Sequence, residues 1–318
     1  MNLPPQFIER FTKIYNQKNL PYLSASGKQT VRINTLQTSV AHAEETLTIS
    51  SIPFKRAKWD ALTLIVNTSD APRISSLDMA THGHIYIQNA SSILASLILS
   101  PAKNSRVLDA AAAPGSKTSH LAAIMQNTGE IIANDISRER CYKLSANLQR
   151  LNVKNTTVIT SPAERLWYKY PECFDYVLLD APCSMESLIA TDRRVAPDWS
   201  VKTIKRLAKR QKWLLRSALS CLKPGGTLVY STCTIAPEEN EGVINWLLEK
   251  EQEKIELEDI QYPHVSFMPG LIQWEQETYN KSLTKTKRVP PSEVFEAFYI
   301  AKMRKHTSTI PSHLRNTL

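Results

Sequence analysis

From His84 onward the chain alternates short apolar segments with longer helical segments, and this alternation constrains the fold more than any other feature of the sequence. The segments that read as strands are HIYIQ (84–88), RVLDA (106–110), EIIAND (130–135), TTVIT (156–160), YVLLD (176–180), TLVYST (227–232) and EAFYIAKMR (296–304). Helical segments separate most of them, and one of these covers about residues 201–222. Strands that alternate with helices of this length predict a parallel, doubly wound α/β sheet.

The first 82 residues have a different texture. Two segments have a helical period and two read as strands: FIERFTKIY (7–15), SVAHAEETL (39–47), TVRINTL (30–36) and ALTLIVNT (61–68). We therefore predict a small N-terminal α/β module at residues 1–82, the doubly wound domain at 83–305 and a flexible tail at 306–318.

The charge balance favours an anionic partner. The chain has 39 Lys and Arg against 30 Asp and Glu, a net charge of +9, which is compatible with nucleic-acid binding. It has no run of about 18 apolar residues and its N-terminus lacks the layout of a signal peptide, so we expect a cytoplasmic protein without membrane contact. Its five cysteines form no C-x-x-C pair, so we expect reduced thiols and no metal site. We also expect a monomer.

The loop DAAAAPGSKTS (109–119) follows a predicted strand and has the composition of a ligand cradle. Its small residues let the backbone approach a ligand, Gly115 permits a tight turn, and Ser116 can cap the next helix. The loop lacks the glycine patterns of dinucleotide and ATP sites, which disfavours both ligands. Asp135, twenty residues beyond Gly115, ends a strand where a carboxylate usually binds ribose hydroxyls. A site for adenosine that lacks a phosphate-binding loop indicates S-adenosylmethionine as the ligand. Asp135 could equally cap the helix that begins at Ser137.

Two of the five cysteines lie where a buried strand becomes a loop. Cys183 follows Asp-Ala-Pro after YVLLD, and Cys233 follows Ser-Thr at the end of TLVYST. The other three, Cys141, Cys173 and Cys221, lie in helical or surface contexts, where we interpret them as small hydrophobic residues.

Several motifs together resemble the Sun/Fmu-type RNA 5-methylcytosine methyltransferases. They are VLDAAAAPGSKT, LLDAPCS, WSVKTIKRLAKRQKWLL, LKPGGTLVYSTCT followed by PEENE, and AFYIAKMRK, in that order. VRINTL and IYIQNASS match as well, so the resemblance covers Val31 to Lys305. It implies a Rossmann-like methyltransferase domain, a small N-terminal RNA-binding module and S-adenosylmethionine as cofactor.

The resemblance also implies a covalent mechanism. In the usual methyltransferase sheet the strands ending at Asp180 and Ser231 are neighbours, about 4.8 Å apart, so both thiols would open into one pocket. Carbon 5 of cytosine is too weak a nucleophile to take a methyl group unaided, so a thiolate first adds at carbon 6. By the family pattern Cys233 attacks, Cys183 assists release and Asp180 holds nitrogen 3, while Lys117 orients Asp180 or lies near the cofactor. The residues expected to bind the cofactor are Ala112, Ala113, Pro114, Gly115, Ser116, Lys117, Asp135 and Asp180.

The chain departs from the family pattern at several positions. Met185 and Ser187 stand where the family has two glycines after the Pro-Cys-Ser, so we expect a stiffer or differently shaped loop. Ala163 stands where an acid near the adenine is common, and Glu164 is a possible substitute. Pro290-Pro291 replaces a Pro-His. We interpret PEENE (237–241) as Pro at the first position of a helix, followed by acids that the helix dipole favours.

Basic side chains mark candidate RNA contacts. The best placed are Arg193 and Arg194, directly after the catalytic loop, with KTKR (285–288) and Arg32 as further options. A predicted helix also carries basic residues off its apolar stripe, a pattern equally typical of a solvated face: Lys202, Lys205, Arg206, Lys209, Arg210 and Lys212.

Our hypothesis from the sequence is an S-adenosylmethionine-dependent RNA cytosine-5 methyltransferase. The motifs AAAPGSKTS and IQNASS most resemble those of the bacterial ribosomal RNA enzymes of this family. Ribosomal RNA is therefore the favoured substrate and transfer RNA the alternative. A ribosome-assembly factor that kept the fold and lost turnover is a second class, which both retained cysteines argue against. An amino-group methyltransferase would have an Asn/Asp-Pro-Pro-aromatic loop in place of DAPCS.

Overall fold

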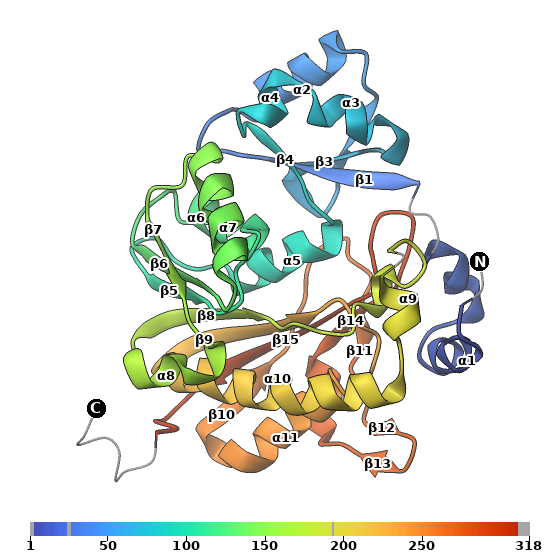
Figure 1. Ribbon diagram of the computed structural model, residues 1–318, viewed down its shortest axis with the longest axis vertical. Coiled ribbons are helices and arrows are strands. Elements are labelled where there is room, and N and C mark those ends of the chain that lie inside the picture. Colours follow the sequence, from blue (N-terminus) through green and yellow to red (C-terminus); the bar gives the residue numbers. More distant parts are fainter. Residues whose placement is uncertain (1–2, 24–26, 193, 311–318) are drawn as a thin grey trace.

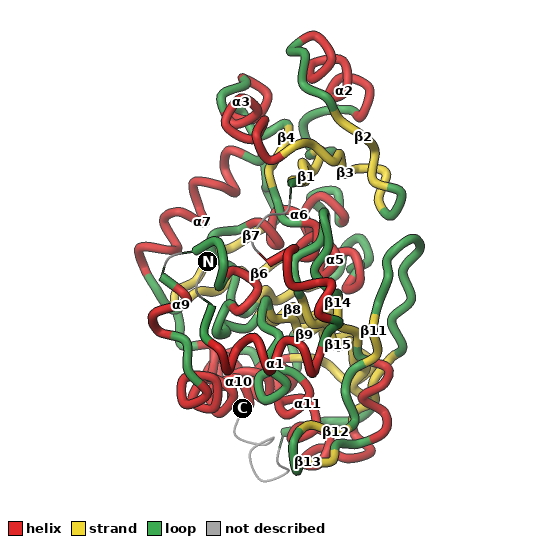
Figure 2. Tube along the Cα trace, turned by 90° about the vertical axis from the view of Figure 1, so that its right-hand side faces the viewer, coloured by secondary structure: helices red, strands yellow, loops and turns green. Residues whose placement is uncertain are grey.

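The computed structural model describes residues 3–23, 27–192 and 194–310, and its N-terminal part is a small four-stranded sheet. The order of this sheet is β2-β3-β1-β4 and all its pairs are antiparallel. Its elements are β1 (Lys28–Ile33), α2 (Val40–Ile49), β2 (Phe54–Ala57), β3 (Asp60–Asn67), α3 (Ala71–Ser75), α4 (Asp78–Thr81) and β4 (Ile85–Ile87). Figures 1 and 2 show this sheet at one end of the molecule, with α10 and α11 at the other end.

The large sheet has the order β11-β14-β15-β9-β8-β5-β6-β7, with β10 also paired to β15. The five strands β5 to β9 are parallel, as predicted, but β15, which was predicted in the same parallel sheet, runs antiparallel to β9. The strands are β5 (Arg106–Asp109), β6 (Glu130–Asp135), β7 (Thr156–Thr160), β8 (Phe174–Asp180), β9 (Leu222–Thr232), β10 (Ile255–Glu258), β11 (Met268–Pro269), β14 (Lys287–Val289) and β15 (Phe298–Lys305). A separate hairpin joins β12 (Gln273–Trp274) to β13 (Glu277–Thr278).

Helices cover both faces of the large sheet (Figure 1). On one side lie α5 (Ala90–Leu99), α6 (Ser116–Ile124) and α7 (Arg138–Arg150), and on the other α8 (Leu166–Lys169), α10 (Val201–Cys221) and α11 (Glu241–Glu251), while α9 (Val195–Asp198) precedes α10. In β8, Leu178 packs with the α5–α6 side, whereas Val177 and Leu179 pack with α10 and α11. Because successive strand residues point to opposite faces, this double burial explains why the central strands are continuously apolar.

Two segments lie in a different sheet or core from the one predicted. β4, predicted as the first strand of the doubly wound sheet, pairs with β1 in the small sheet, where Val31 lies opposite Ile87. The helix predicted in the N-terminal module, α1 (Pro5–Ile14), instead packs on the large domain. There Phe7 contacts Trp199 at 5.8 Å between ring centroids, and Arg10 pairs with Glu238 at 2.6 Å. The apolar stripe of a helix must be buried, but the local sequence does not determine which surface of the protein it packs against.

Two of the predicted RNA contacts are buried. Arg32 is 1% exposed and donates to Gln88 Oε1 at 3.0 Å and to Ser119 Oγ at 2.8 Å, so it joins the small sheet to α6. Burial lowers the pKa of its guanidinium to about 10. Arg288 of the KTKR segment is fully buried against Glu241. The predictions for Arg32 and Arg288 were wrong, because the sequence around a basic residue in a strand is the same whether its side chain faces solvent or a buried polar partner. The two lysines of KTKR are not buried, so RNA contact there stays a prediction.

The remaining predicted surface features have mixed outcomes. Arg194 is exposed and pairs with Asp192 at 2.6 Å, while Arg193 lies outside the described residues. The first residues of the predicted tail are ordered against the domain, since His306 donates its backbone N–H to Lys254 O and Ile310 is buried, and residues 311–318 lie outside the description. None of the described helices is both long and apolar enough to span a bilayer.

We predict that Arg32→Ala lowers the free energy of unfolding by about 3 kcal/mol, because Gln88 and Ser119 lose a charged partner inside the domain interface. Urea unfolding of the purified chain measures this change. Arg194→Ala is the control, and its exposed position should keep the change within about 0.5 kcal/mol. Equal stability of the two variants would contradict the structural role of Arg32.

Candidate active site

A cavity of about 420 Å³ opens at the carboxyl ends of the parallel strands. Ala113 from the loop after β5 lines it, together with Asp135 at the end of β6 and Asp180 at the end of β8. Cys183 and Cys233 enter the same cavity from the loops after β8 and β9. This edge of the sheet is where ligands of doubly wound folds bind, and both thiols share one cavity, as predicted.

The loop after β5 is shaped by Gly115. This residue has φ +104°, a conformation that residues with a Cβ rarely adopt, and a Cβ on it would lie 2.8 Å from Leu144 Cδ1, so glycine is favoured where α7 approaches the loop. Ala112 packs on the same side as Leu144 and does not line the cavity. Pro114, Gly115 and Ser116 form the turn and the start of α6 without lining the cavity. Of the eight predicted cofactor residues, Ala113, Asp135 and Asp180 line it.

Asp135 has structural partners as well as access to the cavity. Its Oδ1 accepts the backbone N–H of Ser137 at 3.0 Å, and its Oδ2 pairs with Arg140 Nη1 at 3.1 Å. The side chain is 2% exposed, so the carboxylate is held firmly at the C-terminal end of β6. The helix cap is Ser137, whose Oγ accepts the backbone N–H of Arg140, so Asp135 positions the cap residue without capping α7 itself and stays on the cavity wall.

Three neighbours of Asp135 were not predicted. Asn134 donates to Ala110 O and to Ser161 O at 3.0 Å each, while its own buried Oδ1 has no partner among the described residues. Ile136 is 53% exposed although apolar, and Arg140 also lines the wall. Little in the sequence indicates that Ile136 lines a ligand cavity, because a single apolar residue after a strand is usually buried.

Asp180 is held by two donors. Ser231 Oγ donates to Asp180 Oδ1 at 2.7 Å, and Lys117 Nζ donates to Asp180 Oδ2 at 2.6 Å. Burial alone would lower the pKa of Lys117, but the carboxylates of Asp180 and Asp109 and the thiol of Cys233 outweigh it and raise that pKa. Lys117 therefore stays an ammonium inside the site, and of the two predicted roles the structure supports the one that orients Asp180.

The two thiols form a pair. Cys183 Sγ and Cys233 Sγ lie 3.3 Å apart, within hydrogen-bond distance for sulfur. The hydrogen bond to Cys233, together with burial and the nearby charges, raises the pKa of Cys183 well above its ordinary value. Because two negative sulfur atoms at this separation would repel each other strongly, Cys183 keeps its proton in this pair.

Met185 and Ser187 shape the loop that carries Cys183. Met185 adopts φ +53°, a left-handed conformation that a glycine would take without strain. Ser187 is buried, and its backbone N–H donates to Cys233 O at 3.1 Å, which ties the two cysteine loops together. The loop therefore keeps a glycine-like backbone although both glycines of the family pattern are missing.

Glu239 holds the loop that carries Cys183 through buried hydrogen bonds. It is fully buried and accepts from Ser184 N at 3.1 Å, from Gln211 Nε2 at 2.7 Å and from Ser184 Oγ. Gln211 also donates to Pro182 O at 2.9 Å, so this side chain of α10 holds Pro182 directly and Ser184 through Glu239. Burial raises the pKa of Glu239 to about 7.

The interpretation of PEENE as a helix start was wrong. Helix α11 begins at Glu241, and each acid of the segment has its own partner. Glu238 pairs with Arg10, Glu239 holds Ser184, and Glu241 pairs with Arg288. The expected acid substitute also failed, because Glu164 pairs with Arg210 at 2.8 Å outside this cavity while Ala163 lines the cavity wall.

Comparison with known proteins places these features in context. Residues 96–304 match a family model described as 16S rRNA methyltransferase RsmB/F. The chain is 37% identical over 306 residues to a tRNA (cytosine(49)-C(5))-methyltransferase of Pyrococcus abyssi, covering 94% of this chain and 96% of that protein. It is also 37% identical over 296 residues to ribosomal RNA small subunit methyltransferase F of Escherichia coli O81, covering 90% of this chain but spanning only 58% of that protein. The crystal structure of a methyltransferase homolog protein from Pyrococcus horikoshii has a TM-score of 0.79 and 31% identity, and covers 95% of this chain and 100% of that one.

We predict that Glu239→Gln gains stability relative to the unaltered chain as pH rises. The carboxyl ionises near 4.5 in the unfolded chain but only near 7 in the fold, so the stability of the unaltered chain falls between these values by about 3 kcal/mol. The variant has no such proton, and the difference should level off above pH 7. Urea unfolding across this pH range measures the difference, and a flat difference would contradict the buried, protonated state of Glu239.

Proposed function

The chain belongs to the 16S rRNA methyltransferase RsmB/F family, and on this premise we propose that it transfers a methyl group from S-adenosylmethionine to carbon 5 of a cytosine in RNA through a covalent cysteine adduct. One observation carries the proposal: two thiols lie 3.3 Å apart in one cavity with the carboxylate of Asp180. A binding factor without turnover would have no use for this arrangement.

The cavity suits S-adenosylmethionine, which supplies an electrophilic methyl group when bound. Its volume, about 420 Å³, is in the range of small-molecule sites. Asp135 offers a carboxylate to ribose hydroxyls, and the unpartnered Oδ1 of Asn134 offers an acceptor. Ala113 and the half-exposed Ile136 supply apolar contact for a base. These acceptors and apolar contacts match an adenosine, and the glycine patterns of phosphate sites are missing from the loop.

Cys233 is the nucleophile of the proposed reaction. Its thiolate forms a bond to carbon 6 of cytosine, and the electron pair of the 5,6 double bond shifts toward carbon 5 and nitrogen 3. Asp180, which Lys117 and Ser231 hold in place, binds nitrogen 3 and passes it a proton from the Lys117 ammonium. Carbon 5 then carries the electron pair that bonds the incoming methyl group.

Cys183 completes the reaction. Its pKa is raised by its hydrogen bond to Cys233 and by burial, so a bond between Cys233 and carbon 6 removes the first of these causes. Cys183 can then give its thiol proton to water in the open cavity, and the resulting thiolate accepts the proton of carbon 5. The electrons of that C–H bond re-form the 5,6 double bond, and the S–C6 pair returns to Cys233 as nitrogen 3 gives back its proton.

Ribosomal RNA is the proposed substrate, with transfer RNA as the second candidate. Transfer RNA is favoured by one observation, since the Pyrococcus abyssi enzyme matches over nearly its whole length. Bisulfite sequencing of total RNA with and without the gene identifies the methylated nucleotide. A methylated position in ribosomal RNA that disappears with the gene would support the first candidate, and one in transfer RNA the second.

We predict opposite behaviour for the two cysteine variants. Cys233→Ala cannot form the carbon 6 bond and should lose methylation while still binding RNA and cofactor. Cys183→Ala should attack and transfer the methyl group but fail to release it. Incubated with RNA and S-adenosylmethionine, it should show a slow, nuclease-sensitive band on a denaturing gel, and the double variant should not.

Two other results would contradict this assignment of roles. A band in Cys233→Ala alone would exchange the two roles. Methylation that survives in Cys233→Ala, with no adduct in either single variant, would reject the thiol mechanism and favour the assembly-factor or amino-methyltransferase alternatives.

We predict that Asp135→Ala weakens S-adenosylmethionine binding by about 1 to 3 kcal/mol, because ribose hydroxyls lose their acceptor. Isothermal calorimetry measures the affinity. The matched control is Ser137→Ala, which removes the Oγ that caps α7 but leaves the carboxylate in place. If both variants lose the same affinity, the effect comes from the helix start and the ribose role is rejected.

A further inference from the structure

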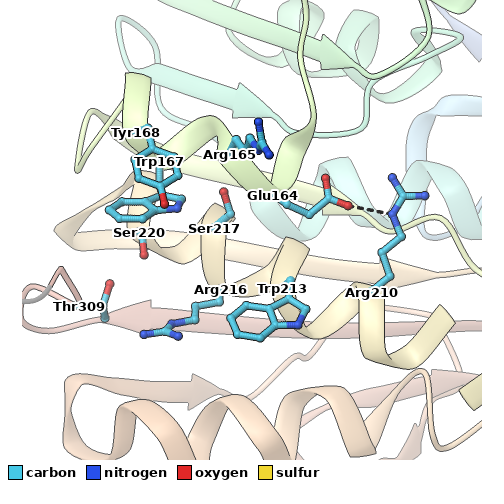
Figure 3. Close-up of a pocket in the computed structure, with 10 residues that line it drawn as sticks. All are labelled: Glu164, Arg165, Trp167, Tyr168, Arg210, Trp213, Arg216, Ser217, Ser220 and Thr309. Carbon is cyan, nitrogen blue, oxygen red and sulfur yellow. Dashed lines mark hydrogen bonds and ion pairs between the residues drawn. The ribbon is translucent and has the colours of Figure 1, made fainter. Parts of the chain in front are cut away.

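A second cleft, of about 540 Å³, lies on the outer side of α8 and α10 and takes no part in the proposed chemistry. Figure 3 shows Trp167 and Tyr168 on one side of it and Trp213 and Arg216 on the other. The ion pair between Glu164 and Arg210 lies at one end (Figure 3).

Aromatic rings line this cleft without filling the core. Tyr168 is 61% exposed and Trp213 is 51% exposed, so most of their apolar area faces solvent. The core position of α8 is taken by Leu166, which is 1% exposed. Trp167 and Tyr168 stack at 4.0 Å between ring centroids, and Trp213 is braced by Trp246 at 6.0 Å. Rigid rings held open to solvent on both sides of a cleft form a platform for another planar group.

The charge of the cleft is positive. Three arginines and one glutamate line it: Arg165, Arg210, Arg216 and Glu164. Arg210 neutralises Glu164, and Arg216 lies 5.9 Å from the centre of the Trp213 ring with Glu251 at 3.8 Å. Arg165 is exposed and has no acid within ion-pair distance among the described residues. Aromatic faces beside guanidinium groups are the combination that binds unpaired bases and their phosphates.

The cleft is adjacent to the active site. Arg210 lines both the cleft and the cavity that holds Cys183 and Cys233. Because carbons 5 and 6 of a base react only when it leaves its stack, each neighbouring base loses a stacking partner and exposes a ring face that another aromatic surface can cover. The aromatic cleft is the surface next to the cavity along α10.

We propose that this cleft is a second RNA-contact site, which stacks unpaired bases next to the target cytosine on Tyr168 and Trp213 and binds their phosphates through Arg165 and Arg216. The inference rests on the proposed methyltransferase activity only for the choice of RNA. The exposed lysines on the same helix, Lys202, Lys205 and Lys209, then offer further phosphate contacts.

Binding of a fluorescein-labelled, cytosine-containing single-stranded RNA to the full chain, without S-adenosylmethionine, tests the site. Trp213→Ala and Tyr168→Ala should each weaken binding about 5-fold or more, whereas Trp213→Phe keeps a stacking ring and should keep most of the affinity. Tyr142→Ala is the matched control, because Tyr142 is 75% exposed on α7 and lines neither cavity. Unchanged binding by both alanine variants, or an equal loss in Tyr142→Ala, would overturn the proposal.

Photo-cross-linking of the unaltered chain avoids any effect of substitutions on folding. An RNA with 4-thiouridine next to the cytosine should cross-link to a peptide that contains Tyr168 or Trp213, and cross-links confined to other peptides would overturn the site. The two proposals fail separately. A cleft cross-link without 5-methylcytosine in any RNA rejects the activity, and 5-methylcytosine without a cleft cross-link rejects this site.

Discussion

The parallel pairing of β8 with β9 places the functional groups of this protein. In that register Asp180 lies opposite Ser231, which donates a hydrogen bond to it, and each strand is followed within three residues by a cysteine. The spacing of hydrogen-bonded strands therefore brings together two thiols that are 50 residues apart in the chain. A shift of one residue in either strand would turn Asp180 or Ser231 to the opposite face and separate them.

The pairing places the thiols, but buried polar groups hold their loops in position. Glu239 and Gln211 fix the backbone on both sides of Cys183, and Ser187 ties that loop to Cys233. A carboxyl such as Glu239 is costly to bury, which is visible in its raised pKa. That cost is offset because several donors converge on it. Arg32 between the two domains is also a buried charge held by polar partners. From the sequence we predicted that it contacts RNA, but in the structure it links the two domains.

Much of the site could be predicted from local sequence, and the failures have a common cause. Cys183, Cys233, Asp180 and Asp135 each follow a strongly apolar strand, so their place at one edge of the sheet follows from the strand pattern. Glu239 and Arg288 could not be predicted, because their surroundings come from segments far away in the chain. Ile136 and Trp213 were not predicted as exposed residues, because the sequence does not show whether a given apolar side chain faces solvent.

The sequence by itself determined the α/β class, the central parallel strands and the two strand-end cysteines, because hydrophobic periodicity and strand-end motifs are local properties. Tertiary structure decided which sheet received β4, which surface buried α1, and which basic and acidic side chains became internal partners. It also left the rings beside α10 open to solvent. These outcomes depend on contacts between segments tens to hundreds of residues apart, where several surfaces could bury the same stripe and only packing of the whole chain selects one.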